Sequence, residues 1–248
     1  MSFTILTPGY VDSSAGVRCL WYLAELMVEA GIDMKILVYT QNFGTIPEKF
    51  RPYLITGTTQ GIIIAPETFQ EIPVPHVRWA LNKPGLLGGP TSYPAGTKVF
   101  HFSPEIYESA SCATPEKQSE LFMLANIQLP SLPRRKKTLR AFYRGKCAEQ
   151  VDMERHENEL EMTRTWPPTK QQYWEFLNNL STLYSYDDFS AVNLEAYLMG
   201  VSVMVLQSGI WKPYTPPSYA HSLLMDRVRD IESVKKFAAS CLSHFSMV

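Results

Sequence analysis

The sequence predicts an α/β protein that consists of two Rossmann-like domains facing each other across a cleft. Two observations favour this fold class. Short apolar runs typical of buried strands alternate with amphipathic helical segments along most of the chain. A proline-containing linker near residue 130, followed by a basic run, divides this alternation into two halves. We therefore expect one domain at residues 1–128 and a second at residues 129–248, which ends in a C-terminal helix.

The first half is expected to open with a βαβ unit. A strand at residues 3–7 is followed by a helix from residue 17 to a glycine cap at Gly31, and then by a strand at residues 35–39. The helix carries apolar residues at i, i+3 and i+4 spacing. The remaining elements expected in this half are strands at residues 61–65 and 98–102 and helices at residues 76–82 and 116–126.

The second half repeats this alternation. A helix at residues 168–180 opens with proline and threonine, and the next one runs from an N-cap at Ser190 to Gly200. The other elements expected there are strands at residues 139–143, 160–163, 181–184 and 201–206 and a tail helix at residues 218–240.

Composition narrows the class of protein. The formal net charge of -1 argues against a uniformly basic nucleic-acid-binding surface. The four cysteines are far apart and the five histidines are scattered, so zinc-ligand spacing is absent and we expect reduced thiols in a cytoplasmic protein. The N-terminus lacks the features of a signal peptide, and no apolar run approaches the ~20 residues of a transmembrane segment.

Two acidic residues flank the start of a helix in the second half. Asp187 and Glu195 are eight residues apart, and Ser190 lies between them at the expected N-cap. This helix follows a strand, so its N-terminus lies at the carboxyl edge where open α/β sheets bind ligands. Free N–H groups at a helix start suit a phosphate, and carboxylates beside them suit sugar hydroxyls. A helix-capping aspartate and a solvated glutamate are the alternative interpretation.

The same stretch resembles the C-terminal half of GT-B glycosyltransferases that use nucleotide sugars. Retaining members of that family carry Glu-x7-Glu followed by Ala, Gly and an apolar strand, and this chain has Asp187-x7-Glu195, Ala196 and Gly200. The resemblance implies a compact GT-B fold with the acceptor side on the first domain and the donor side on the second, in which Glu195 binds the ribose of the donor and Asp187 contacts the transferred sugar. Asp187 has a shorter reach than the usual glutamate, and Ser202 replaces a usual proline.

Further residues extend the resemblance. Arg144 and Lys146 lie where the family places basic residues against the donor diphosphate, and Ser190 and Gly16 mark helix N-termini that would add partial positive charge. His101 follows a strand where some relatives have a histidine that contacts the donor sugar; a buried core histidine is the alternative. Three further matches, with no role to transfer, are Pro66-Glu67, Arg78-Trp79 and Asn82 with Pro84-Gly85.

The resemblance implies a glycosyltransferase that moves a sugar from a nucleoside diphosphate to an acceptor glycan. We expect retention of configuration, no cofactor besides the donor substrate, and no metal, since a D-x-D motif is absent. One alternative is glycosylation of a modified DNA base, with the basic run at residues 134–137 meeting a phosphate backbone. Another is a non-catalytic scaffold of the same fold.

Overall fold

The computed structural model forms two compact units. It describes residues 2–246 with the exception of residues 13, 41–44, 70–75, 87–88, 95–96, 111–118, 125–126, 134, 147–150 and 164. The first unit comprises Met1–Val11, Gly16–Asn126 and Met225–Val248, and the second comprises Ile127–Leu224 with Asp12–Ala15. Each unit is an α/β structure around a mostly parallel sheet, as the sequence predicts.

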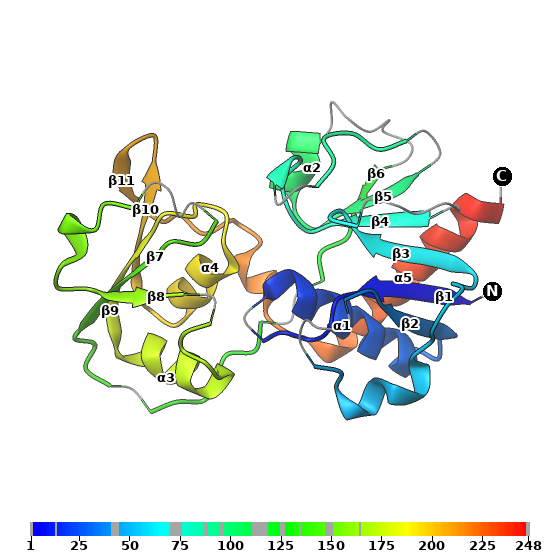
Figure 1. The fold of residues 1–248 in the computed structure, drawn as a ribbon, viewed down its shortest axis with the longest axis horizontal. Helices are drawn as coiled ribbons and strands as arrows, with labels where there is room; N and C mark the ends of the chain where they lie inside the picture. The colour runs from blue at the N-terminus through cyan, green and yellow to red at the C-terminus, as the bar shows by residue number, and fades with distance from the viewer. Residues whose placement is uncertain are drawn as a thin grey trace. The chain divides into compact units, whose positions relative to one another are not determined.

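The first unit contains a six-stranded sheet in which every neighbouring pair is parallel (Figure 1). The strand order is β2-β1-β3-β4-β5-β6. Its strands are β1 (Phe3–Thr7), β2 (Met34–Val38), β3 (Ile62–Pro66), β4 (His76–Ala80), β5 (Lys98–His101) and β6 (Ser119–Leu121). The interior strands β1, β3 and β4 are buried on both faces, as parallel strands usually are, and β3 is apolar throughout.

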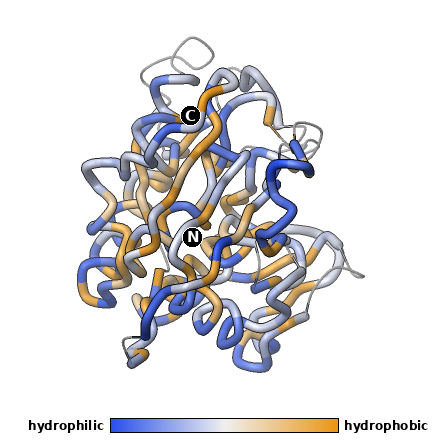
Figure 2. Tube along the Cα trace, turned by 90° about the vertical axis from the view of Figure 1, so that its left-hand side faces the viewer, coloured by the Kyte–Doolittle hydropathy of each residue, from blue (hydrophilic) through white to orange (hydrophobic). Residues whose placement is uncertain are grey.

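Helices α1 (Ala15–Glu29) and α5 (Arg227–Ser246) contribute to the core of this unit, and α2 (Pro104–Ala110) and the 3-10 helix η1 (Glu48–Tyr53) complete it. Trp21 of α1 and Phe237 of α5 are both buried in one apolar cluster with Trp79 and Phe100 of the sheet. In Figure 2, hydrophobic stretches in orange run through the interior of the trace, while hydrophilic stretches in blue lie mostly on outer loops.

The second unit contains a five-stranded sheet in the order β11-β10-β9-β7-β8. All neighbouring pairs are parallel except β10 and β11, which form an antiparallel hairpin. The strands are β7 (Leu139–Tyr143), β8 (Leu160–Met162), β9 (Leu180–Ser185), β10 (Ser202–Gln207) and β11 (Ile210–Pro213), and the helices are α3 (Lys170–Asn179), α4 (Ala191–Leu198) and the 3-10 helices η5 (Glu154–His156) and η6 (Ala220–Leu223). Apolar side chains of α3 and α4 pack on one face of this sheet.

The two sheets share one topology. In chain order, the first four strands of each unit are arranged 2-1-3-4, and the order reverses between the first and third strands. Neighbouring connections leave the sheet in opposite directions at such a switch point and open a crevice at the carboxyl ends of the strands, where α/β folds bind ligands. The switch points lie between β1 and β3 and between β7 and β9.

Three sequence-based expectations need correction. The helix expected at residues 76–82 is strand β4, because this segment is buried on both faces between β3 and β5 and its Arg78 is bonded to backbone carbonyls at the end of β3 and in the loop that follows it. Within the helix expected at residues 116–126, residues 119–121 form strand β6, and residues 116–118 and 125–126 lie outside the described part. The C-terminal helix, which we placed in the second domain, belongs to the first unit because Val234 and Phe237 are part of its core.

No helix in the described part of the chain is long and apolar enough to cross a membrane.

Candidate functional site

The switch point of the second unit brings several of the expected site residues together. Strands β7 and β9 are parallel neighbours, and Tyr143 at the end of β7 is paired with Ser185 at the end of β9. The residues that follow the two strands therefore leave the same edge side by side. Arg144 and Lys146 follow β7, and Asp187 and Ser190 follow β9, immediately before α4.

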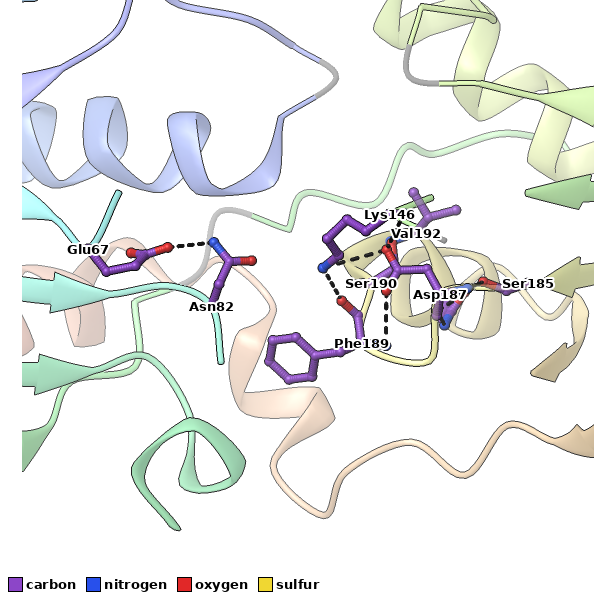
Figure 3. Close-up of polar contacts among 9 residues, drawn as sticks. Glu67, Asn82, Lys146, Ser185, Asp187, Phe189, Ser190 and Val192 are labelled. Carbon is purple, nitrogen blue, oxygen red and sulfur yellow. Dashed lines mark hydrogen bonds and ion pairs between the residues drawn. The ribbon is translucent and has the colours of Figure 1, made fainter. Parts of the chain in front are cut away.

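Asp187 and Lys146 hold this edge together (Figure 3). The Asp187 carboxylate accepts hydrogen bonds from the backbone N–H of Phe189 (3.2 Å) and of Lys146 (3.3 Å). The Lys146 ammonium donates to the carbonyl of Phe189 at 2.7 Å, and its Nζ lies 3.5 Å from Asp187 Oδ2. Asp187 is only 3% exposed, and this burial raises its pKa, although Lys146 acts in the opposite direction. The carboxylate thus fixes the turn after β9 and pairs with Lys146.

The same turn is hydrogen-bonded to the first residues of α4. The Asp187 carbonyl accepts from Ser185 Oγ at 3.0 Å and from Asn193 Nδ2 at 2.7 Å. Ser190 is the N-cap of α4, as its position in the sequence predicts, and its hydroxyl accepts from the N–H of Val192 at 3.3 Å. The helix N-terminus is therefore held next to the Lys146–Asp187 pair, where its partial positive charge and that of the ammonium lie close together.

Gly145 allows the two strand ends to approach. Its φ is +58°, and a Cβ placed on it would lie 2.3 Å from Asp187 Cβ. A side chain at this position would both strain the backbone and displace the aspartate.

Arg144 and Glu195 have other partners. The Arg144 Nε lies 2.7 Å from Glu161 Oε1, and its Nη2 donates to Oε2 at 3.0 Å, so the guanidinium forms a two-point pair with β8. Glu195, on α4, is 2% exposed and interacts with α3: Oε2 accepts from Tyr173 Oη at 2.6 Å, and Oε1 lies 3.3 Å from Lys170 Nζ. It is therefore not the solvated glutamate of the alternative interpretation.

Gly16 and His101 belong to the first unit and do not adjoin each other there. Gly16 is in the first turn of α1, which follows β1, whereas His101 ends β5, and β3 and β4 lie between these strands. The His101 ring is fully buried, its Nε2 lies 2.6 Å from Ser119 Oγ, and it packs edge-on against Tyr107. These contacts are those of a hydrogen-bonded core histidine.

The structure also shows a buried polar chain that the sequence did not reveal. His156 lies 2.5 Å from Glu159 Oε2 through Nδ1 and 2.7 Å from Tyr186 Oη through Nε2, and its ring stacks on Phe142. Tyr186 is the residue before Asp187, so this polar chain links η5 to the turn at the switch point. Only the three-residue spacing of His156 and Glu159 was visible in the sequence.

Comparisons with known proteins give no match: no protein-family model and no curated protein sequence is significantly similar to this chain. Within the described residues, no group of three or more histidine, cysteine, aspartate or glutamate side chains is arranged to hold a metal ion.

Proposed function

We propose that the protein is a glycosyltransferase and that its second unit binds a nucleoside diphosphate sugar at the β7/β9 switch point. One observation carries the proposal: a lysine, a buried aspartate and a capped helix N-terminus converge at the carboxyl edge where this topology binds ligands. On this proposal the two units form a compact GT-B enzyme with the donor on the second unit and an acceptor glycan as partner.

Lys146 and the start of α4 would bind the diphosphate. The ammonium has three N–H donors, and its partners in the structure are the Phe189 carbonyl and the Asp187 carboxylate, so donor capacity remains for a phosphate oxygen. The helix N-terminus adds a favourable dipole. When the bond to the sugar breaks, negative charge grows on the departing diphosphate, and these fixed positive groups stabilise it.

Glu195 would bind the ribose hydroxyls, and Asp187 would contact the transferred sugar. The Glu195 carboxylate accepts from Tyr173 Oη and lies 3.3 Å from Lys170 Nζ, and a carboxylate offers about four acceptor positions. Arg144 would join the diphosphate site by exchanging Glu161 for phosphate oxygens, which a guanidinium binds with the same two-point geometry.

A non-catalytic nucleotide-binding protein is the second candidate. The observation that favours it is that both proposed carboxylates, Asp187 and Glu195, are already bonded to neighbouring protein groups. The basic run considered for DNA gains no such support, because Lys137 turns its ammonium inward to the carbonyl of Leu177 at 3.1 Å.

Calorimetric titration with uridine diphosphate and guanosine diphosphate tests the binding step. We expect one of them to bind, and Lys146→Met to weaken its affinity about tenfold or more, because one charge-assisted hydrogen bond to phosphate is lost. Lys212→Met, which removes an exposed lysine of β11 in the same unit, is the matched control and should bind like the wild type.

Two results contradict the proposal: neither nucleotide binds, or Lys146→Met binds as tightly as Lys212→Met. Release of free sugar from the corresponding sugar nucleotide then separates the two candidates. A transferase hydrolyses the donor slowly without an acceptor, whereas the scaffold binds the nucleotide and leaves the donor intact.

A further inference from the structure

The polar chain that ends on Tyr186 also closes the connection that carries Lys146. Lys146 follows β7, and the same connection to β8 contains η5 with His156 and, just before β8, Glu159. Lys146 pairs with Asp187, and His156 is bonded to Tyr186, the residue before Asp187. The connection between β7 and β8 is therefore attached to the end of β9 at two separate points.

The hydrogen bonds of this chain have a defined direction. A carboxylate only accepts, so His156 Nδ1–H donates to Glu159 at 2.5 Å, and in the neutral ring Nε2 accepts from the Tyr186 hydroxyl at 2.7 Å. Burial raises the pKa of Tyr186, which keeps the hydroxyl proton in place for this bond. The Tyr186 oxygen accepts in turn from the backbone N–H of Asp152 at 3.1 Å, and the other oxygen of Glu159 lies 2.8 Å from Arg140 Nη2. The neutral imidazole thus uses both its donor and its acceptor.

Aromatic rings hold His156 in this orientation. Its side chain is buried and stacks on Phe142 of β7, with 4.5 Å between the ring centroids. The rings of Tyr184 on β9 and Trp211 on β11 lie 5.8 Å and 6.1 Å away. Rotation of the imidazole would break both hydrogen bonds inside a packed core, so the chain acts as a rigid support.

This support transmits its rigidity to the candidate site through Tyr186. The backbone N–H of Tyr186 donates to the carbonyl of Tyr143, the last residue of β7, at 2.9 Å, so Tyr186 is fixed at its backbone as well as at its hydroxyl. The next residue is Asp187, whose carboxylate accepts from the N–H groups of Lys146 and Phe189 (Figure 3).

We propose that Tyr186, His156 and Glu159 are positioning residues, which fix the Asp187 turn and the Lys146 connection in the geometry in which the ammonium meets the start of α4. The positioning itself is a property of the free chain. Its effect on a nucleoside diphosphate rests on the proposed function. The experiments therefore measure the free chain and nucleotide binding separately.

Hydrogen exchange of the ligand-free full chain, followed by NMR, tests the positioning directly. The backbone amides of Lys146 and Phe189 are the reporters, because both donate to the Asp187 carboxylate. Tyr186→Phe keeps the ring and removes only the hydroxyl. We expect it to accelerate exchange at both reporters by about fivefold or more relative to the amides of strand β10. Tyr197→Phe, which removes a hydroxyl from a side chain that is 40% exposed on α4, is the matched control and should change neither reporter.

Two substitutions of His156 separate positioning from mere filling of the core. Glutamine offers an amide donor and a carbonyl acceptor, as the neutral imidazole does, whereas leucine fills the space and bonds to neither partner. We expect exchange at the two reporters to be about threefold or more slower in His156→Gln than in His156→Leu. Near-ultraviolet circular dichroism confirms that each variant is folded, and Tyr186→Phe tests the proposal independently of both.

Calorimetric titration with uridine diphosphate and guanosine diphosphate then connects the positioning to ligand binding. Tyr186→Phe should weaken the nucleotide that binds by about three- to tenfold. In the Lys146→Met background the same substitution should have less than about a twofold effect, because its influence is exerted through the lysine.

The inference is overturned if Tyr186→Phe leaves both reporters as slow as in Tyr197→Phe, if β10 accelerates equally, or if His156→Gln and His156→Leu exchange alike. It is also overturned if a nucleotide binds and Tyr186→Phe leaves its affinity unchanged or lowers it equally with and without Lys146. Faster exchange at the reporters in a chain that binds neither nucleotide refutes only the proposed function, and the positioning role stands.

Discussion

At the residue scale, His101 shows how burial acts on a titratable side chain. Its ring is fully enclosed, Nε2 is bonded to Ser119, and Nδ1 has no hydrogen-bond partner among the described residues. Burial lowers the pKa of this imidazole from 6.5 to about 4. The folded chain therefore keeps His101 neutral at pH values where the unfolded chain has already taken up a proton.

The sign of the pH effect follows. As the pH falls from about 6.5 to about 4, the unfolded state binds the proton first, and the free energy of unfolding decreases by up to roughly 3 kcal/mol. Urea denaturation of wild type and His101→Gln at pH 7 and pH 4.5 checks this. The difference between the two proteins should shrink at the lower pH, while His221→Gln, at an exposed histidine, should follow the wild type. A constant difference at both pH values contradicts the prediction.

Gly145 is the residue on which the geometry of the candidate site depends most directly. We expect Gly145→Ala to lower the free energy of unfolding by roughly 2–4 kcal/mol, because a left-handed backbone and a displaced Asp187 add their costs. Gly200→Ala is the matched control: φ is +72° there, but an added Cβ meets nothing within 4 Å, so only the backbone cost of about 1–2 kcal/mol remains. Chemical denaturation of both variants measures their free energies of unfolding. An equal decrease in the two variants would contradict a tight contact between position 145 and Asp187.

At the scale of elements, residues typical of helix starts made α3 and α4 predictable. Ser190 accepts from the N–H of Val192 and caps α4, as predicted. Thr169, which we placed in the first turn of a helix beginning at residue 168, is instead the N-cap of α3 and accepts from the N–H of Gln172. The hairpin of β10 and β11 was missed although Ser208-Gly209 is a turn signal, and both residues have positive φ. The sequence pattern predicted a helix where the structure has strand β4. A strand buried on both faces is not expected to contain an arginine, and Arg78 is accommodated there because it bonds to backbone carbonyls that only the folded chain brings near.

The candidate site was predictable in the same limited way. The positions of Lys146, Asp187 and Ser190 after strands or before a helix were enough to place them at one sheet edge, because parallel strands end on the same side. The partners of Arg144 and Glu195 were not predictable. Glu161 meets Arg144 only through the pairing of β7 with β8, and Tyr173 and Lys170 meet Glu195 only through the packing of α3 beside α4.

At the scale of the whole molecule, the chain returns to its first unit at the end. Helix α5 contacts α1 through a hydrogen bond from Tyr22 Oη to Asp230 at 2.9 Å and through ion pairs of Arg227 with Glu25 and Glu29. Its Phe237 stacks on Phe122 with 4.3 Å between the ring centroids and lies 4.5 Å from the Phe100 ring. A division of the chain at one boundary therefore does not describe the units, because the first is completed by the last residues.

This arrangement predicts that a defect in α5 weakens the first unit and leaves the second intact. Phe237→Ala should lower the stability of the first unit by about 3–5 kcal/mol, as expected for truncation of a buried aromatic residue. Hydrogen exchange followed by mass spectrometry should show faster exchange in β1, β3 and β5 and unchanged exchange in β7, β9 and β10. Val228→Ala, on the same helix at a side chain that is 76% exposed, should change neither unit. Equal acceleration in both sheets would mean that they unfold as one cooperative body, because local loss of core contacts in one unit would then be felt throughout the chain.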